Sequence, residues 1–180
     1  MLILASGSPR RAKILRQLGV AFEVRKSDAL EVCHPGDPER TVRENALAKG
    51  AALTAEARRF GAGVLSADTI VWMDGRIYGK PRDLGEAKVF LRELSGRTHT
   101  VFTGVAYNGE AKVVRSDVTF RRLSEADIAA YVARVNPLDR AGAYDIDESG
   151  ELLVERWTGT SENIMGLPVE PLREWGLVHG

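Results

Sequence analysis

Six charged residues in the first half of the chain have the types needed for phosphate chemistry. The cations are Arg10, Arg11, Lys49 and Lys80, and the carboxylates are Glu31 and Asp68. A cluster of cations binds a polyphosphate well, while a carboxylate pair can hold magnesium against it or activate water. Water that attacks the phosphate next to the sugar would split a nucleoside triphosphate into a monophosphate and pyrophosphate. These residue types therefore favour metal-assisted phosphate hydrolysis, provided that the fold brings them together.

Asp68 stands out because it interrupts the strongest strand pattern in the chain. The run Gly63–Met73 is nearly all apolar, and alternation places Asp68 on the same face as Val64 and Ile70. Aspartate is depleted in strands, and an unpaired buried carboxylate is costly. Asp68 therefore needs a cation, a metal ion or a network of donors. The alternatives are a structural ion pair and a strand that ends early at a cleft.

The first eleven residues are typical of an anion site between a strand and a helix. Leu2–Ala5 is an apolar run suited to a buried strand, Ser8 is a good N-cap, and Pro9 fits the first helical position. Backbone N–H groups and the positive end of the helix dipole would then point at one place. The two arginines that follow oppose this dipole, which an anion between them would explain. The alternative is a capped helix with two solvated arginines.

Lys49 falls on the apolar stripe of a second predicted helix, which Asp37 caps and which runs to about residue 58. It lies seven residues after Val42 and four before Leu53. A lysine in such a position often extends its ammonium group to solvent. The alternative is that it points into a cleft and carries positive charge to a ligand.

The rest of the chain mixes strands and helices. Further helices are expected over 83–94, 124–135 and 168–176, and further strands over 22–25, 98–107, 112–122 and 151–157. Asn108-Gly109 predicts a hairpin between two of these strands, while 26–36 and 136–150 are expected to be loops. The pattern indicates one α/β domain over residues 1–180, with a mixed sheet flanked by helices.

Composition narrows the class of protein. The formal net charge is zero, and no basic stripe with interleaved aromatic residues occurs, which argues against nucleic-acid binding. The single Cys33 excludes an intrachain disulfide and suits a reducing compartment. No targeting segment or membrane span is evident, so a cytoplasmic protein that does not bind membranes is expected. With three histidines and one cysteine, a metal would be held by oxygen ligands, as magnesium or manganese is.

Seven motifs together resemble the Maf family of nucleotide pyrophosphatases, also called septum-formation-inhibitor-like proteins. They are ASGSPRR (5–11), ENALAKG (44–50), SADTIV (66–71), GKPRD (79–83), SGRTHTVFTG (95–104), DRAGAYDI (139–146) and NIMGLP (163–168). The resemblance implies an elongated mixed sheet and two lobes with a central cleft, similar to the inosine-triphosphate pyrophosphatases. It also implies hydrolysis of nucleoside triphosphates with Mg²⁺, Mn²⁺ or Co²⁺, and it suggests a homodimer.

The resemblance also implies roles for individual residues. It assigns the water-activating carboxylate to Asp68, and metal binding to Asp68 and Glu31. It assigns substrate phosphate contacts to Ser6, Arg10, Arg11, Lys49 and Lys80. The paired arginines resemble the branch of the family that acts on dTTP and UTP, so these or modified pyrimidine nucleotides are the expected substrates.

One position departs from that branch. After the Ala-Gly-Ala-Tyr segment the branch usually has Ile-Gln-Gly, whereas this chain has Ile146-Asp147-Glu148. An ionised carboxylate only accepts hydrogen bonds, whereas an amide also donates them. Asp147, as a substrate-binding residue, is therefore expected to alter base choice, or to weaken activity unless a metal or a lysine offsets its charge. The departure keeps open a second function, a catalytically weak nucleotide-binding regulator of cell division.

Overall fold

The computed structural model describes residues 1–178 and contains seven strands, six α-helices and three 3-10 turns. The strands are β1 Leu2–Leu4, β2 Glu23–Val24, β3 Gly63–Met73, β4 Arg76–Tyr78, β5 Thr98–Tyr107, β6 Glu110–Phe120 and β7 Val154–Trp157. The helices are α1 Pro9–Gln17, α2 Pro38–Arg59, α3 Leu84–Leu94, α4 Glu125–Arg134, α5 Ser161–Ile164 and α6 Val169–Glu174. The 3-10 turns are η1 Pro137–Asp139, η2 Ala141–Ala143 and η3 Gly150–Leu152.

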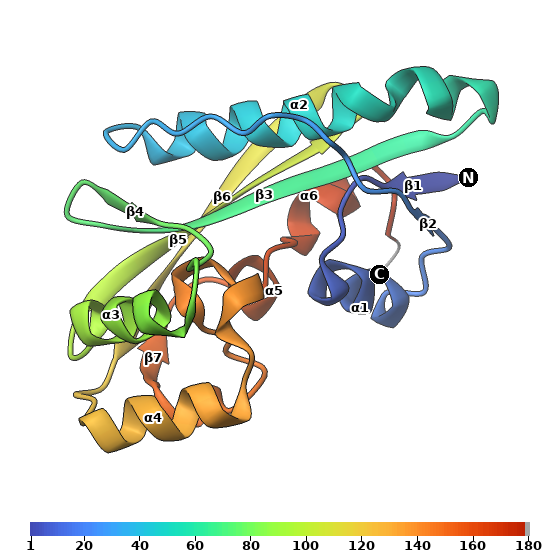
Figure 1. Cartoon of the computed structure of the whole chain (residues 1–180). Helices are drawn as coiled ribbons and strands as arrows, with labels where there is room; N and C mark the ends of the chain where they lie inside the picture. Colours follow the sequence, from blue (N-terminus) through green and yellow to red (C-terminus); the bar gives the residue numbers. More distant parts are fainter. Residues whose placement is uncertain (179–180) are drawn as a thin grey trace.

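All seven strands form one mixed sheet, as the sequence predicts. The order is β2-β1-β3-β5-β6-β7, and β4 pairs with β3. β1 is parallel to both β2 and β3, whereas the other pairs are antiparallel. The long strands β3, β5 and β6 run the length of the molecule and give it an elongated shape (Figure 1).

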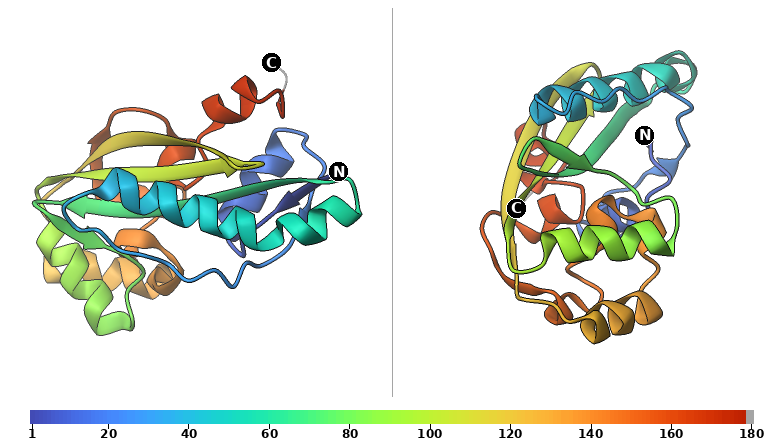
Figure 2. Two further views of the ribbon diagram at one scale, coloured as in Figure 1. Left: turned by 90° about the horizontal axis from the view of Figure 1, so that it is seen from above. Right: turned by 60° about the vertical axis from the view of Figure 1, so that its left-hand side comes forward.

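Helices cover both faces of this sheet. α2 lies along one face, while α1, α3 and α4 lie on the opposite side (Figures 1 and 2). Under α2, Val42 packs with Ile70 and Phe102. On the other side, one core gathers around α3 and α4 and a second around β1, α1 and α6. Among residues 1–178, no helix combines the length and the apolar character needed to cross a bilayer.

The edge of β3 that faces β1 is open at its centre. β1 pairs with Gly63–Leu65 and β4 pairs with Val71–Met73, so that no described strand covers residues 66–70 on this side. On its other side β3 pairs with β5 without interruption from Leu65 to Trp72. Asp68 therefore occupies a gap in the sheet edge, in the middle of a strand that continues past it.

Gly104 allows α2 to lie close to this gap. It is paired with Asp68 in the β3–β5 register. A Cβ atom at Gly104 would come within 2.2 Å of the backbone oxygen of Val42 in α2. Only glycine therefore lets the helix backbone approach β5 so closely. The next turns of α2 consequently lie over Asp68.

Several predicted boundaries are confirmed by capping contacts. The side chains of Asp37 and Asp83 accept hydrogen bonds from backbone N–H groups in the first turns of α2 and α3. Ser124 and Asp127 form the expected capping box of α4. Ser8 is the N-cap residue of α1, but its hydroxyl makes no capping hydrogen bond.

Other boundaries differ from the sequence prediction. No strand was predicted over residues 76–78, yet they form β4, because Asp74 and Gly75 adopt positive φ angles and make a two-residue hairpin. The hairpin at Asn108-Gly109 is equally tight, so β6 begins at Glu110 instead of 112. β7 begins at Val154 instead of 151, since residues 150–152 form η3. The expected loop 136–150 contains η1 and η2.

Candidate active site

A cavity of about 580 Å³ opens at the gap in the edge of β3. It has the size of a typical small-molecule site. The cavity is lined by residues from the start of α1, from α2, from the centre of β3 and from the segment around η2. Residues of the connection between β2 and α2 complete the lining. We call this connection, residues 25–37, the strap. The six charged residues singled out in the sequence all line this cavity: Arg10, Arg11, Glu31, Lys49, Asp68 and Lys80.

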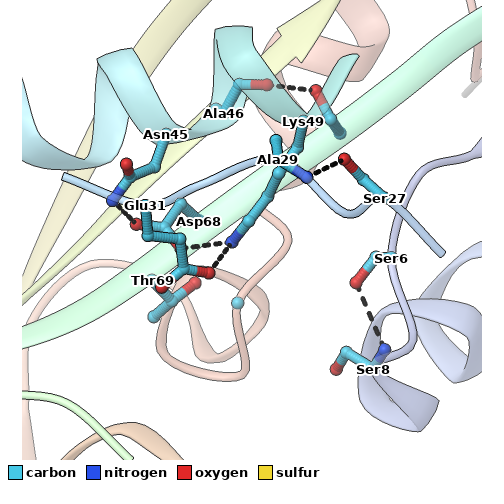
Figure 3. Close-up of polar contacts among 12 residues, drawn as sticks. Ser6, Ser8, Ser27, Ala29, Glu31, Asn45, Ala46, Lys49, Asp68 and Thr69 are labelled. Atoms are coloured by element: carbon cyan, nitrogen blue, oxygen red, sulfur yellow. Dashed lines mark hydrogen bonds and ion pairs between the residues drawn. The ribbon is translucent and has the colours of Figure 1, made fainter. Parts of the chain in front are cut away.

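Asp68 is buried and bonded at both carboxylate oxygens. Its Oδ1 accepts a hydrogen bond from Lys49 Nζ at 2.7 Å, and its Oδ2 accepts one from Asn45 Nδ2 at 3.0 Å. Both donors come from α2, which the close approach at Gly104 brings over the strand (Figure 3). These two donors compensate for the cost of burying a carboxylate. The arrangement provides a fixed anionic acceptor at the cavity wall.

Lys49 joins the two carboxylates of the site. Its Nζ lies 2.7 Å from Glu31 Oε1 as well as 2.7 Å from Asp68 Oδ1. The ammonium group therefore points into the cavity instead of extending to solvent (Figure 3). Burial alone would raise the pKa of Glu31, but the hydrogen bond and charge of Lys49, with Lys80 and Arg11, lower it below its ordinary value. Glu31 is thus ionised at neutral pH.

Arg11 is held by neutral oxygen atoms. Its Nε donates to the Gly166 carbonyl at 2.8 Å, Nη1 to Ser6 Oγ at 2.9 Å, and Nη2 to Thr69 Oγ1 at 3.1 Å. Burial lowers the pKa of Arg11 to about 10, against the opposing effect of the Asp68 charge, so the group stays cationic at neutral pH. Ser6 does not line the cavity but lies behind Arg11 and orients it.

Arg10 and Lys80 lie near the segment around η1 and η2. Arg10 Nη2 donates to the Asp139 carbonyl at 2.8 Å, and Arg10 Nε lies 3.7 Å from Asp145 Oδ2. Lys80 Nζ lies 3.6 Å from Asp139 Oδ1, with two thirds of its side chain exposed. Arg10 is therefore positioned, whereas Lys80 has room to move toward a ligand.

Sequence reasoning missed three residues of this cavity. Arg140 and Asp145 belong to the segment 136–150, which was expected to be a loop, but they are 8% and 4% exposed and line the cavity. Their side chains approach within 3.8 Å, which buries opposite charges together. Asn45 contacts Asp68 directly. Arg140 and Asp145 could have been predicted as an ion pair, because they have opposite charges and flank Gly142. No local sequence pattern distinguishes Asn45 from any other polar residue in a helix.

Asp147 does not line the cavity. Its carboxylate pairs with Lys13 of α1, and its backbone N–H donates to Asp145 Oδ1 at 2.8 Å. The hydrogen bond and charge of Asp147 raise the pKa of Lys13. Lys13 thus offsets the negative charge of Asp147. From the sequence, weaker activity is expected only where neither a metal nor a lysine offsets this charge. Contact between Asp147 and a substrate stays a prediction.

The carboxylates suit a metal that is shared with a ligand. Glu31 and Asp68 converge on one cationic group at the cavity wall. Among residues 1–178, no group of three or more histidine, cysteine, aspartate or glutamate side chains could hold a metal ion. Mg²⁺ is commonly bound by only one or two carboxylates, with substrate phosphates and water completing its shell. The donor set therefore fits such an ion and does not form a site enclosed by protein alone.

These features define an α/β protein with a cavity for a phosphorylated ligand, in which cations surround two carboxylates at an open strand edge. The model of the family described as Maf-like protein matches residues 1–175, and the chain belongs to this family.

Relatives named dTTP/UTP pyrophosphatase match most of the chain. One from Myxococcus xanthus is 44% identical, over 94% of this chain and 87% of its own length. One from Bacillus cytotoxicus is 44% identical, over 94% and 91% respectively. One from Thermotoga maritima is 42% identical, over 93% and 84%. These matches confirm the Maf family membership that the motifs suggested. The names of the relatives also agree with the expected dTTP/UTP branch of the family.

Proposed function

We propose that this protein hydrolyses nucleoside triphosphates to the monophosphate and pyrophosphate, with dTTP, UTP or modified pyrimidine nucleotides as substrates. The proposal rests on the position of Asp68. Its buried carboxylate is bonded to Lys49 and Asn45 at the wall of a cavity that is lined by cations. The names of the relatives agree with this reaction and supply the choice of base.

The triphosphate would be bound by the cations and by the start of α1. Arg11 has only neutral acceptors, so its charge is available to an anion. The first turn of α1 has no acidic residue and no side-chain cap, which leaves its backbone N–H groups available to the same anion. Lys80 is exposed enough to close over a bound phosphate. Arg10, Arg11, Lys49 and Lys80 thus balance a ligand with several negative charges.

Glu31 and Asp68 would hold the divalent cation together with phosphate oxygens, as Mg²⁺, Mn²⁺ or Co²⁺ requires. When bound, such an ion neutralises charge on the phosphates and polarises the bond that breaks. Both carboxylates already lie 2.7 Å from a single cationic atom, Lys49 Nζ. Its ammonium group would transfer from these carboxylates to a phosphate oxygen when the ligand is bound.

Asp68 would accept a proton from the attacking water. The water oxygen bonds to the phosphorus next to the sugar, the bond from this phosphorus to the bridging oxygen breaks, and pyrophosphate leaves. Asn45 of α2 still holds Oδ2 after Lys49 has moved to the phosphate, so the carboxylate keeps its orientation during the step. Positioning and charge stabilisation would account for most of the rate.

The test is a nucleotide panel with Mg²⁺, Mn²⁺ or Co²⁺, in which pyrophosphate and monophosphate are both measured. The substitution Asp68→Asn keeps the side-chain shape but removes the proton acceptor, and we expect kcat to fall at least about 100-fold. Asp117→Asn is the matched control, because Asp117 is also a strand aspartate but lies outside the cavity lining. Nucleotide binding without turnover across the whole panel would contradict the proposal and favour the regulatory function.

A further inference from the structure

The strap carries Glu31 to the site, yet its own side chains bury little surface there. Leu30 is 91% exposed, and the Glu31 side chain is 61% exposed. The strap has no regular secondary structure between β2 and α2. Packing of these side chains therefore does not fix where Glu31 lies, and hydrogen bonds from the rest of the molecule must do so.

Asn45 of α2 supplies these bonds next to Glu31. Its Oδ1 accepts a hydrogen bond from the Val32 N–H at 2.8 Å, and its Nδ2 donates to the Val32 carbonyl at 3.0 Å. The same Nδ2 donates to Asp68 Oδ2 at 3.0 Å. A primary amide has two N–H hydrogens, so both are used. The side chain is 3% exposed, and its orientation is fixed from both ends.

These contacts close a ring around the site. Asp68 bonds to Asn45, Asn45 to the backbone of Val32, the neighbouring Glu31 to Lys49, and Lys49 back to Asp68. Figure 3 shows the contacts of Asp68 with Asn45 and Lys49 and that of Lys49 with Glu31. The backbone next to Glu31 is thus tied, through Asn45, to the carboxylate of Asp68. From this ring we infer that Asn45 is a positioning residue that aligns Glu31 with Asp68 for the reaction, an inference that rests on the proposed function.

Thr41 offers a matched control on the same face of α2. It lies one turn before Asn45, is 2% exposed, and holds the strap two residues further on, where its Oγ1 accepts from the His34 N–H at 2.9 Å. The structure gives Thr41 contacts with His34 and Asp37 and none with Asp68. Thr41 also lines the cavity, but its hydroxyl bonds only to backbone atoms of the strap. Thr41→Val keeps the shape of the side chain and therefore loosens the strap without changing the partners of Asp68.

The first experiment compares the kinetics of Asn45→Ala and Thr41→Val at a series of Mg²⁺ concentrations. Removing a partner of two metal-binding groups typically costs about 10- to 100-fold in activity or metal affinity. For Asn45→Ala we expect a loss of this size in kcat and a higher Mg²⁺ concentration at half-maximal rate, with KM for the nucleotide nearly unchanged. For Thr41→Val we expect less than about a threefold change. Parallel losses in the two variants would overturn the inference and leave Asn45 a merely structural residue.

The second experiment needs no turnover and separates this inference from the proposed function. Hydrogen exchange over residues 29–34 is measured in the protein without nucleotide. We expect faster exchange of the Val32 amide in Asn45→Ala, and also in Asp68→Ala, because the ring loses its anchor. Unchanged exchange in Asp68→Ala would overturn the link, whatever the wild-type activity.

If Asn45→Ala does not fold, Asn45→Asp replaces it in the first experiment, and Asp68→Ala alone carries the second. This variant keeps the shape and the acceptor for the Val32 N–H but loses both donated bonds. The same losses in kcat and Mg²⁺ dependence are expected, and wild-type values would contradict the inference.

Discussion

Two of the cations in the cavity have different kinds of partner. Arg11 donates to three uncharged oxygens, whereas Lys49 donates to the two carboxylates Glu31 and Asp68. The charge of Lys49 is therefore balanced in the free protein, while that of Arg11 is not balanced by direct contact. An incoming anion gains most from Arg11 at first, since no ion pair must be broken there.

At position 147, restoring the amide expected for the dTTP/UTP branch should change the choice of base. Asp147→Gln releases Lys13 from its ion pair, and its side chain can donate as well as accept hydrogen bonds. We expect the order of kcat/KM among dTTP, UTP and CTP to change. Lys13→Gln is the control for losing the ion pair alone. An unchanged order in Asp147→Gln would show that this position does not set base choice.

Side chains that violate a local pattern could be found from the sequence, and those that obey it could not. Asp68 in an apolar strand and Lys49 on an apolar stripe were both marked in this way, and the structure brings them together. Asn45 sits on a helix face where a polar residue is unremarkable. Its importance arises from contacts with Val32 and Asp68, which depend on how α2 crosses the sheet.

At the scale of elements, the contact between α2 and β5 is the one that places the site. We expect Gly104→Ala to destabilise the protein by about 3 kcal/mol, because the added methyl group would overlap the backbone of Val42. Activity of the folded fraction should also fall, since a displaced α2 moves Asn45 and Lys49 away from Asp68. Chemical denaturation and kinetics measure the two effects.

Gly36→Ala is the control for the loss of a glycine. A Cβ atom at Gly36 would meet nothing within 4 Å, and no positive φ angle is recorded there. We expect a change within about 0.5 kcal/mol. Equal effects of the two substitutions would mean that the close approach at Gly104 is unimportant.

Long, periodic elements were predictable, and short ones were not. The limits of α2, α3 and β3 follow from caps and from runs of apolar residues, which are local properties. β4 has three residues and exists because it pairs with the end of β3. The turns η1 and η2 lie in a polar segment that is held by tertiary contacts, including a backbone bond from Gly142 to Gly79. Such contacts carry no periodic signal.

At the scale of the whole molecule, His99 should make stability depend on pH. It is 1% exposed in an aromatic cluster, with its Nε2 2.7 Å from the Tyr144 hydroxyl. Burial lowers the pKa of His99 to about 3, although the charge of Asp117 opposes this. The unfolded chain therefore takes up a proton below about pH 6.5, and the folded protein does not until about pH 3. The free energy of unfolding thus falls across this range as pH decreases.

Between pH 7.5 and pH 5.5 we expect His99 to remove about 1.4 kcal/mol from the free energy of unfolding. Denaturant titrations at the two pH values measure the difference. His99→Gln should abolish this contribution, because glutamine does not titrate. Tyr144→Phe should retain it, since the imidazole stays buried, even if overall stability is lower. A wild-type slope in His99→Gln would refute the assignment.

β3 and β5 each contribute side chains to both main cores. Leu65 and Ala67 belong to the core around α1, while Val71 and Met73 belong to the core around α3 and α4. The pairing between β3 and β5 continues without a break from the first core to the second. Within residues 1–178, this continuous pairing joins the two halves and opposes rotation of one against the other. For the proposed function, we therefore expect a nucleotide to enter and leave by movement of the exposed strap instead of by separation of two lobes.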